Sequence, residues 1–342
     1  MTGRFSRGLG GGLLLCAACL VAQWELASVA AAKPNLWDAA RSPRAKRASQ
    51  GLVAVERMLM RIEDAYPHPT MVRDLSLAAL ALAELSGGVQ LGDYRLDYLM
   101  GRLLTSPAVG RYAEGVAVLE KALAMRPDFP QAAEALYCLG RALARTGQRD
   151  RAIRVLKRAL NSEWDLDLRA SIALELGWQW MQMGRLPKAL SMFSQATEAA
   201  QDKYSVALSY YALAAALDRS GDMPGALRAA AVAAHIQVSG DLSGVVDVFD
   251  LPLVDLDPDR EVHYLRALGA MARAAELDAS DSAREQLTAA IHDWDAYLRE
   301  AEPLADRWIG TARRHREACY QRLEQYRAQA GLAQDAALRG AR

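Results

Sequence analysis

Beyond its first 32 residues, the chain lacks the residue patterns that carry metal binding, redox chemistry or nucleic-acid binding. No two of its five histidines lie four residues apart, so the helical zinc-protease arrangement is excluded. Neither Cys138 nor Cys319 has a cysteine partner at CxxC spacing. With 41 basic and 41 acidic residues, the formal net charge is +0, without the basic excess of a nucleic-acid-binding domain. We therefore expect no metal, no cofactor and no nucleic-acid partner.

Catalytic motifs are missing as well. The glycine run Gly8–Gly12 lacks the Lys-Ser/Thr ending of a phosphate-binding loop, and no serine lies in a nucleophile-elbow motif. The acidic run from Asp255 resembles the start of a calcium loop. However, Arg260 stands where the turn glycine belongs, and Arg266 stands where the final glutamate belongs. The sequence predicts a protein that is not an enzyme.

Residues 1–32 are typical of a secretory signal peptide. A basic start is followed by an apolar core at Leu13–Ala22, and the small residues Ala30–Ala32 offer a cleavage point. The core is too short to span a bilayer. An uncleaved anchor and lipid attachment at Cys19 are open alternatives. We expect an exported protein, periplasmic or associated with the cell envelope.

Residues 33–48 read as a flexible start of the mature chain. The segment contains prolines and a cluster of basic side chains, which are Arg41, Arg44, Lys46 and Arg47. These cations can contact an anionic membrane or cell-wall surface. A solvated linker is the simpler interpretation.

The chain is rich instead in a repeat with a period of 37 residues. Gly147, Gly184 and Gly221 recur at that spacing, and each is preceded and followed by a ladder of apolar residues. β-Branched runs are scarce, which favours helix. A repeat of this length predicts a helix–turn–helix unit that buries its apolar face only by stacking on its neighbours.

The repeat resembles the tetratricopeptide repeat. The best copy carries the motif at Leu136, Leu139, Gly140, Leu143, Gly147, Ala152, Leu156 and Ala159. A second copy carries it at Ala173, Leu176, Gly177, Trp180, Gly184, Ala189, Phe193 and Ala196. A third departs further, with Ala214 for the glycine and Ala230 for the aromatic residue. The resemblance implies an all-α, right-handed superhelical solenoid of about four to six helix–turn–helix repeats.

The periodicity also divides the chain. Residues 93–237 hold the repeats, and residues 49–92 read as a divergent helical pair. Residues 238–259 form an irregular acidic and apolar insertion, expected to pack on the solenoid through Val246, Phe249, Leu251 and Leu253. Residues 260–330 read as a second divergent pair followed by a capping helix from Pro303, and residues 331–342 as a disordered tail.

The resemblance also implies which side chains face a partner, because the first helix of each such repeat lines the concave surface. These positions carry aromatic, arginine and other polar side chains typical of binding anchors. They are Glu134, Tyr137, Arg141, Arg145, Leu174, Trp178, Gln182, Tyr211, Asp218 and Arg219. An alternative for Trp178 and Tyr211 is that they fill gaps between neighbouring repeats. Trp180 occupies a core position of its helix.

The sequence therefore predicts an exported scaffold that holds a protein segment, either an extended peptide or a helix, in its concave groove. Similar exported proteins of this family serve in secretion, outer-membrane assembly, polysaccharide export and motility, so we expect a role in assembling an envelope complex. A carbohydrate-binding or enzyme-accessory solenoid, stacking its aromatic residues on sugar rings, is the alternative.

Overall fold

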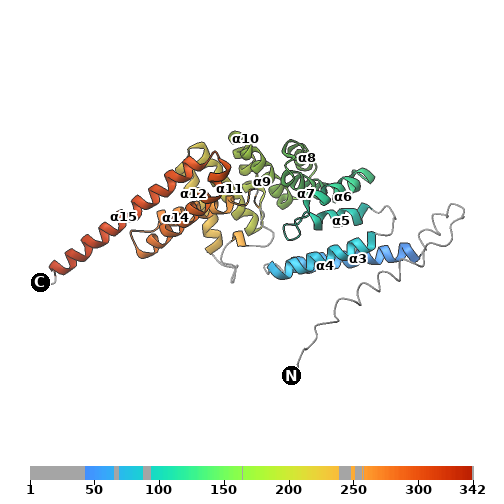
Figure 1. Ribbon diagram of the computed structural model, residues 1–342, viewed down its shortest axis with the longest axis horizontal. Coiled ribbons are helices and arrows are strands. Elements are labelled where there is room, and N and C mark those ends of the chain that lie inside the picture. The colour runs from blue at the N-terminus through green and yellow to red at the C-terminus, as the bar shows by residue number, and fades with distance from the viewer. Residues whose placement is uncertain are drawn as a thin grey trace, which may run out of the picture. The chain divides into compact units, whose positions relative to one another are not determined.

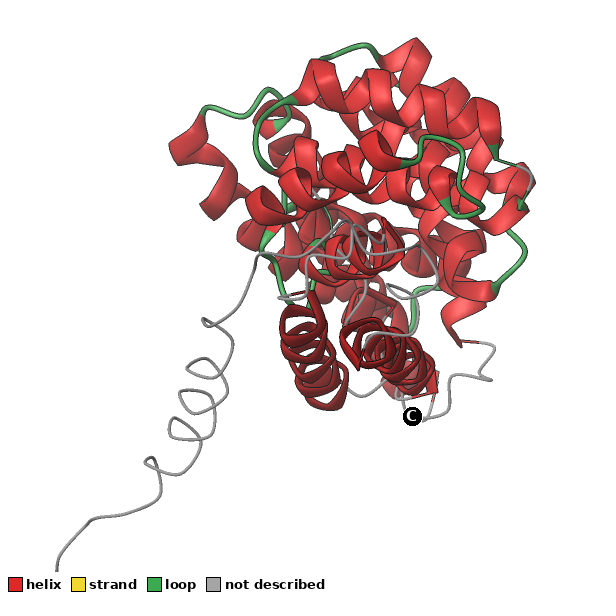
Figure 2. Cartoon of the chain, turned by 90° about the vertical axis from the view of Figure 1, so that its right-hand side faces the viewer, coloured by secondary structure: helices red, strands yellow, loops and turns green. Residues whose placement is uncertain are grey.

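The described part of the chain is built from α-helices joined by short loops. Figure 2 shows red helices and green loops there, with no strand in any described range. The computed structural model describes residues 43–64, 69–87, 94–163, 165–238, 248–250, 256 and 258–340. Residues 1–32, where a signal peptide is expected, lie outside these ranges, as do Cys19 and Arg41. The prediction of an all-α solenoid is confirmed.

Most helices form consecutive antiparallel pairs, which Figure 1 shows in chain order. The first two are α3 (Pro43–Asp64) and α4 (Pro69–Gly87). The repeat pairs are α5 (Tyr94–Leu104) with α6 (Tyr112–Met125), α7 (Ala132–Arg145) with α8 (Arg149–Ser162), α9 (Leu166–Gln182) with α10 (Leu186–Ala199), and α11 (Lys203–Ser220) with α12 (Met223–Val238). The remaining elements are η1 (Val248–Asp250), α13 (Glu261–Glu276), α14 (Asp281–Ala301), η2 (Glu302–Leu304) and α15 (Ile309–Gly340).

The turn inside each repeat depends on its glycine. Gly147, Gly184 and Gly221 have φ angles of 79°, 71° and 95°, a left-handed conformation that favours glycine. Gly110, one period earlier, has φ 68°. The next N–H bonds back to a carbonyl five residues earlier, as in Gln148 to Leu143 at 2.8 Å. This hydrogen bond ends the first helix of the unit, so each repeat glycine lies in the turn between two helices.

Helices within a pair approach closely because a small residue faces a large one. A Cβ atom added to Gly140 would lie 2.5 Å from Leu156 Cγ, and Gly101 faces Leu119 in the same way. One period on, Gly177 faces Phe193, again sixteen residues later in the chain. In the third copy the same two positions hold Ala214 and Ala230, both fully buried. The two departures of the third copy from the motif, Ala214 for glycine and Ala230 for the aromatic residue, thus occur at two positions that face each other.

The pairs stack within one unit, residues 48–342. Each second helix packs on the first helix of the following pair, and the first helices also contact one another along the row. Second helices approach one another less, so the first helices line the inner side of the solenoid. The buried residues form one apolar cluster from Leu52 to Leu176 and another from Trp178 to Tyr326.

Three segments differ from the expectation at their boundaries. Helix α3 begins at Pro43, so residues 43–48 are helical. Proline is tolerated at a helix start, and the alanine and basic residues that follow favour helix. Pro303 lies in the short turn η2, and left-handed Ala305 (φ 49°) separates that turn from α15. Helix α15 then continues to Gly340, through most of the expected tail.

The insertion packs on the inner side through its described residues. Val248 and Phe249 of η1 and the nearby Leu256 are buried. The Phe249 ring lies 5.0 Å from the ring of Tyr211 in α11. Of the four residues expected to make this contact, Val246, Leu251 and Leu253 lie outside the described residues.

Candidate functional site

Three of the predicted groove residues line one pocket. Its volume is about 280 Å³, and it lies among α3, α4, α5, α7 and the turn after α5. Glu134, Tyr137 and Arg141 come from α7. The other lining residues are Leu59, Ser76, Arg102, Leu103, Ser106, Pro107 and Cys138. The wall therefore combines two guanidinium groups and one carboxylate with an apolar floor.

Glu134 ties α7 to α5. Its carboxylate accepts a hydrogen bond from the Tyr98 hydroxyl at 2.5 Å and pairs with Nε of Arg102 at 3.0 Å. Burial, followed by the Glu134 carboxylate, raises the pKa of Tyr98 well above its usual value. Tyr98 therefore remains a hydrogen-bond donor at neutral pH and fixes the position of the carboxylate.

Arg141 spans the turn at the other side of the pocket. Its Nη2 atom donates to the backbone oxygen of Thr105 at 2.8 Å, and its guanidinium lies 5.4 Å from the centre of the Tyr137 ring. Burial raises the pKa of Tyr137 to about 12, although the nearby arginine opposes the shift. The Tyr137 ring is thus a neutral surface beside a fixed cation.

Two polar residues of this site, Tyr98 and Arg102, were not among the predicted groove residues. A spacing of 39 residues, in place of 37, would have selected them. Tyr98 and Arg102 stand 39 residues before Tyr137 and Arg141, in the shared pattern Tyr-x-x-Gly-Arg. The first unit has a longer turn, from Thr105 to Arg111, so its first helix is displaced by two residues from the 37-residue period. A strict period therefore misses them.

Arg145, one turn beyond Arg141, contacts the insertion. Its Nη2 atom donates to the Leu256 carbonyl at 2.6 Å, and Nη1 lies 3.3 Å from an Asp259 carboxylate oxygen. Leu256 therefore lies at the C-terminal end of α7, where Arg145 binds its backbone carbonyl.

Trp178 and Tyr211 lie in the interior. Trp178 is 5% exposed and packs edge-on against Phe193 at 5.4 Å. Tyr211 is 1% exposed, and its ring packs against Phe249 and the backbone of α13 at Gly269. Both side chains therefore fill gaps between neighbouring helices, which was the alternative interpretation of the sequence. Neither offers an exposed surface to a partner in this structure.

Asp218 and Arg219 are also interior and bind other parts of the chain. Asp218 accepts hydrogen bonds from the Tyr264 hydroxyl and from Nε2 of His315. Arg219 and Glu261 form a fully buried ion pair at 2.6 Å, with the guanidinium 4.2 Å from the Tyr264 ring centre. These two residues connect α11 to α13 and α15 instead of facing a partner.

Of the remaining predicted residues, Leu174 and Gln182 are half-buried on α9. Leu174 packs against the second apolar cluster. Trp180, expected in the core, is half-buried, and its ring lies under the ammonium groups of Lys157 and Lys188.

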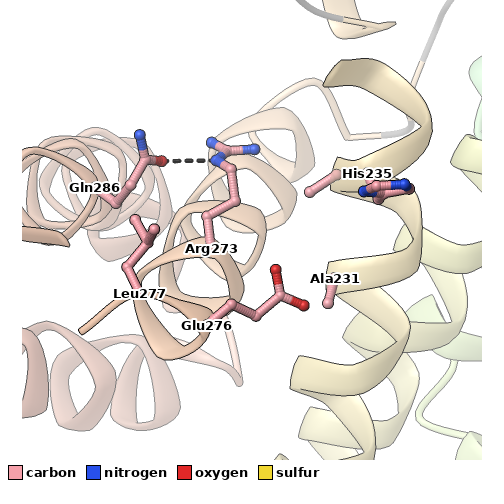
Figure 3. Close-up of a pocket in the computed structure, with 7 residues that line it drawn as sticks. Ala231, His235, Arg273, Glu276, Leu277 and Gln286 are labelled. Atoms are coloured by element: carbon pink, nitrogen blue, oxygen red, sulfur yellow. Dashed lines mark hydrogen bonds between the residues drawn. The ribbon is translucent and has the colours of Figure 1, made fainter. Parts of the chain in front are cut away.

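A second pocket, of about 200 Å³, lies between α12, α13 and α14 (Figure 3). There Arg273 donates to Gln286 at 2.6 Å, and Glu276 points from α13 towards Ala231. His235 lines the same pocket from α12. None of the predicted groove residues contributes to it.

The described residues offer no metal site and no membrane span. They contain no cluster of His, Cys, Asp or Glu able to hold a metal ion. Across the same ranges, no helix has the length and apolar character needed to cross a bilayer. Cys138 and Cys319 are free, buried thiols.

Fold and site together define a helix-pair solenoid with a polar pocket on its inner side. Residues 108–167 match the family model described as Tetratricopeptide repeat. This stretch of the chain is therefore tetratricopeptide-repeat sequence, and the helix pairs on either side of it have the same helix–turn–helix arrangement. No curated protein sequence matches it.

Solved structures with related helix arrangements include MamA from Desulfovibrio magneticus RS-1, which is 21% identical over 57% of this chain and 97% of that one, with a TM-score of 0.45. BtubC from P. vanneervenii is 16% identical over 60% of this chain and 94% of that one, with a TM-score of 0.44. YrrB, described as a TPR protein with an unusual peptide-binding site, is 22% identical over 55% of this chain and 96% of that one, with a TM-score of 0.38.

Proposed function

We propose that this chain is an exported, non-enzymatic scaffold that binds a segment of a partner protein on its inner side. The observation that carries the proposal is the pocket lined by Glu134, Tyr137 and Arg141. Its guanidinium groups and carboxylate are held by neighbouring helices, so they are in position before a partner arrives. Preorganised polar groups around an apolar floor are typical of segment recognition.

The occupied part of the inner side shows how a segment is held there. Arg145 binds the backbone carbonyl of Leu256, and Phe249 packs its ring on Tyr211. The hydrogen bond of an arginine to a backbone carbonyl and the packing of an aromatic ring against an apolar side chain are contacts that a polypeptide segment can make. We place the partner's segment beside this region, at the pocket between α3 and α7.

The carbohydrate alternative has less support. Sugar stacking needs an exposed aromatic face, and Trp178 and Tyr211 are 5% and 1% exposed. Tyr137 has Arg141 over its ring.

The site of action we propose is the cell envelope. The support is in the sequence, where residues 1–32 have the organisation of a signal peptide. The envelope processes that such scaffolds serve include secretion, outer-membrane assembly, polysaccharide export and motility. Arg44, Lys46 and Arg47, at the start of α3, could add a peripheral contact with an anionic surface.

The test is mild crosslinking in the exporting cell, followed by purification and identification of what is attached. The variant Arg102→Ala/Tyr137→Ala/Arg141→Ala removes the pocket's side chains. The control Tyr320→Ala/Arg327→Ala removes one tyrosine and one arginine from the exposed surface of α15. Circular dichroism checks that both variants stay helical, and the N-terminal residue of the recovered protein reports export and cleavage.

We expect a defined protein partner with the wild type and the control and at least a tenfold loss, roughly 1.4 kcal/mol, with the pocket variant. A partner retained by the pocket variant would move the interface elsewhere and refute the site. Recovery of a glycan without a protein would refute the scaffold. An intact leader on the recovered chain would contradict cleavage.

A further inference from the structure

The outer face of α8 carries an unusual concentration of positive charge. The helix buries its apolar side in the core, and four of its solvent-facing side chains are cations. These are Arg151, Arg154, Lys157 and Arg158, all exposed. They occupy successive turns of one helix, so their charges lie in a row.

The 37-residue register provides an internal comparison. The same four positions of the preceding second helix, α6, hold Glu114, Ala117, Glu120 and Lys121. On α10 they hold Lys188, Ser191, Ser194 and Gln195, and on α12 they hold Gly225, Arg228, Ala231 and Val232. Each of these helices contributes one cation where α8 contributes four. The charge is therefore a property of this unit and not of the repeat.

Trp180 extends the row to the next unit. The Lys157 ammonium lies 5.1 Å from the centre of its ring, and the Lys188 ammonium lies 4.4 Å from it. Cation–π contacts of this length hold both groups near one another. We call Arg151, Arg154, Lys157, Arg158 and Lys188 the basic strip.

Among the described residues, one ion pair is formed with the basic strip, and one further carboxylate of α8, that of exposed Asp150, stands four residues before Arg154. Arg151 pairs with Glu120 of α6. Arg154, Lys157, Arg158 and Lys188 form no ion pair with any described residue. Like charges three and four residues apart destabilise a helix. The fold thus retains a repulsive arrangement whose field attracts negative charge.

We propose that the basic strip docks an acidic polypeptide segment of a partner protein. The strip follows α8 and ends at Lys188 of α10. On α6 the one cation at the equivalent positions, Lys121, is paired with Asp97, and the other equivalent positions of α6 and α10 are neutral or acidic. A flat anionic membrane would face all the second helices at once, whereas a single acidic segment matches one row. This surface belongs to the second helices and is separate from the pocket on the first helices, so the scaffold could hold two partners.

The test measures binding of a fluorescently labelled peptide of about the length of α8, with glutamates on one helical face, to the full chain by anisotropy. The variant Arg154→Glu/Arg158→Glu reverses two charges of the strip. The matched control is Arg228→Glu, which is exposed and stands at the position of Arg154 two units later. Vesicles of phosphatidylserine and phosphatidylcholine are the second probe.

We expect the wild type and Arg228→Glu to bind the peptide alike, and the double variant to bind at least about tenfold more weakly. Added salt should weaken the wild-type complex, because exposed charges are screened. The milder Arg154→Gln/Arg158→Gln variant should give an intermediate loss with unchanged helicity. Equal affinity for all variants, or no peptide binding, would overturn the proposal, as would binding to vesicles alone. A partner at the inner pocket should bind the double variant normally.

Discussion

At the scale of single residues, helix spacing within a unit is set by volumes that compensate each other. Gly140 faces Leu156, Gly177 faces Phe193, and in the third copy two alanines share the same space. Sixteen residues separate the partners in each case, so one contact recurs with three different compositions. Neither position can change size independently of the other.

The effect of Gly140→Ala on the free energy of unfolding should therefore depend on the residue at position 156, and its sign should differ between the wild type and the Leu156→Ala variant. In the wild type the added Cβ overlaps Leu156, a cost of about 1–3 kcal/mol for overpacking. The gain in helix propensity from replacing glycine, about 1 kcal/mol, offsets part of it. In the Leu156→Ala background the overlap is gone, and the same substitution should be stabilising.

Urea denaturation of the four proteins of this cycle, followed by far-UV circular dichroism, checks the prediction. Leu156→Ala alone should cost about 2–5 kcal/mol as a cavity. If Gly140→Ala destabilised both backgrounds equally, the two residues would not share their space as described.

At the scale of elements, α15 closes the C-terminal end of the row. It packs on α14 and reaches α11 through the hydrogen bond from His315 to Asp218. Cys319 faces inward from this helix and is 1% exposed. Cys138 is buried in α7, which has neighbouring pairs on both sides. The two thiols therefore report on an end and on the middle of the solenoid.

Neither thiol should react with iodoacetamide in the native protein at neutral pH. Burial raises the pKa of Cys319 to about 11 and also raises that of Cys138, so both stay protonated. As urea is added, Cys319 should be labelled before Cys138, because a terminal helix has a neighbour on one side only and opens first.

Pulsed labelling with mass spectrometry, in a chain with Cys16→Ser and Cys19→Ser, separates the two sites. Simultaneous labelling would mean that α15 opens together with the centre of the row. Earlier labelling of Cys138 would contradict its central position.

At the scale of the whole molecule, the apolar residues divide into two clusters. Trp178, Trp294 and Trp308 lie in or against the C-terminal cluster, and Trp180 packs against both clusters. Helices, in contrast, are present along both clusters. Because a solenoid is stabilised mainly by contacts between neighbours, its two halves can lose structure at different urea concentrations.

Unfolding followed by tryptophan fluorescence should therefore not coincide with unfolding followed by far-UV circular dichroism. In a chain with Trp24→Phe, Trp37→Phe, Trp164→Phe and Trp180→Phe, fluorescence reports the C-terminal cluster, and circular dichroism reports all helices. Coincident transitions, together with equal calorimetric and van't Hoff enthalpies, would show instead that the clusters unfold as one cooperative unit.

The period in the sequence predicts contacts that lie within and between repeats. It therefore predicts the turn glycines and the helix pairs, and it selects Glu134, Tyr137 and Arg141, which the structure brings to one pocket. It cannot predict contacts with segments outside the period. Tyr211 is covered by Phe249 of the insertion, and the ion pair of Arg219 is with Glu261 of α13.

Asp218 is also buried by a segment outside the period. Its partner His315 belongs to α15, almost a hundred residues later in the chain. Tyr98 and Arg102 were missed because the first helix of their unit is displaced by two residues from the 37-residue period. The sequence thus predicts the inner side where it is built from regular repeats. It does not predict the positions that irregular segments cover.

The paired volumes inside each unit also limit how such a gene can be rearranged. Duplication or deletion of a complete 37-residue unit carries both partners of a pair together and preserves their fit. A recombination breakpoint between the two helices of a unit would place Ala214 against Phe193, or Gly177 against Ala230. The first hybrid is overfilled and the second contains a void, so productive exchanges should join at the loops between units.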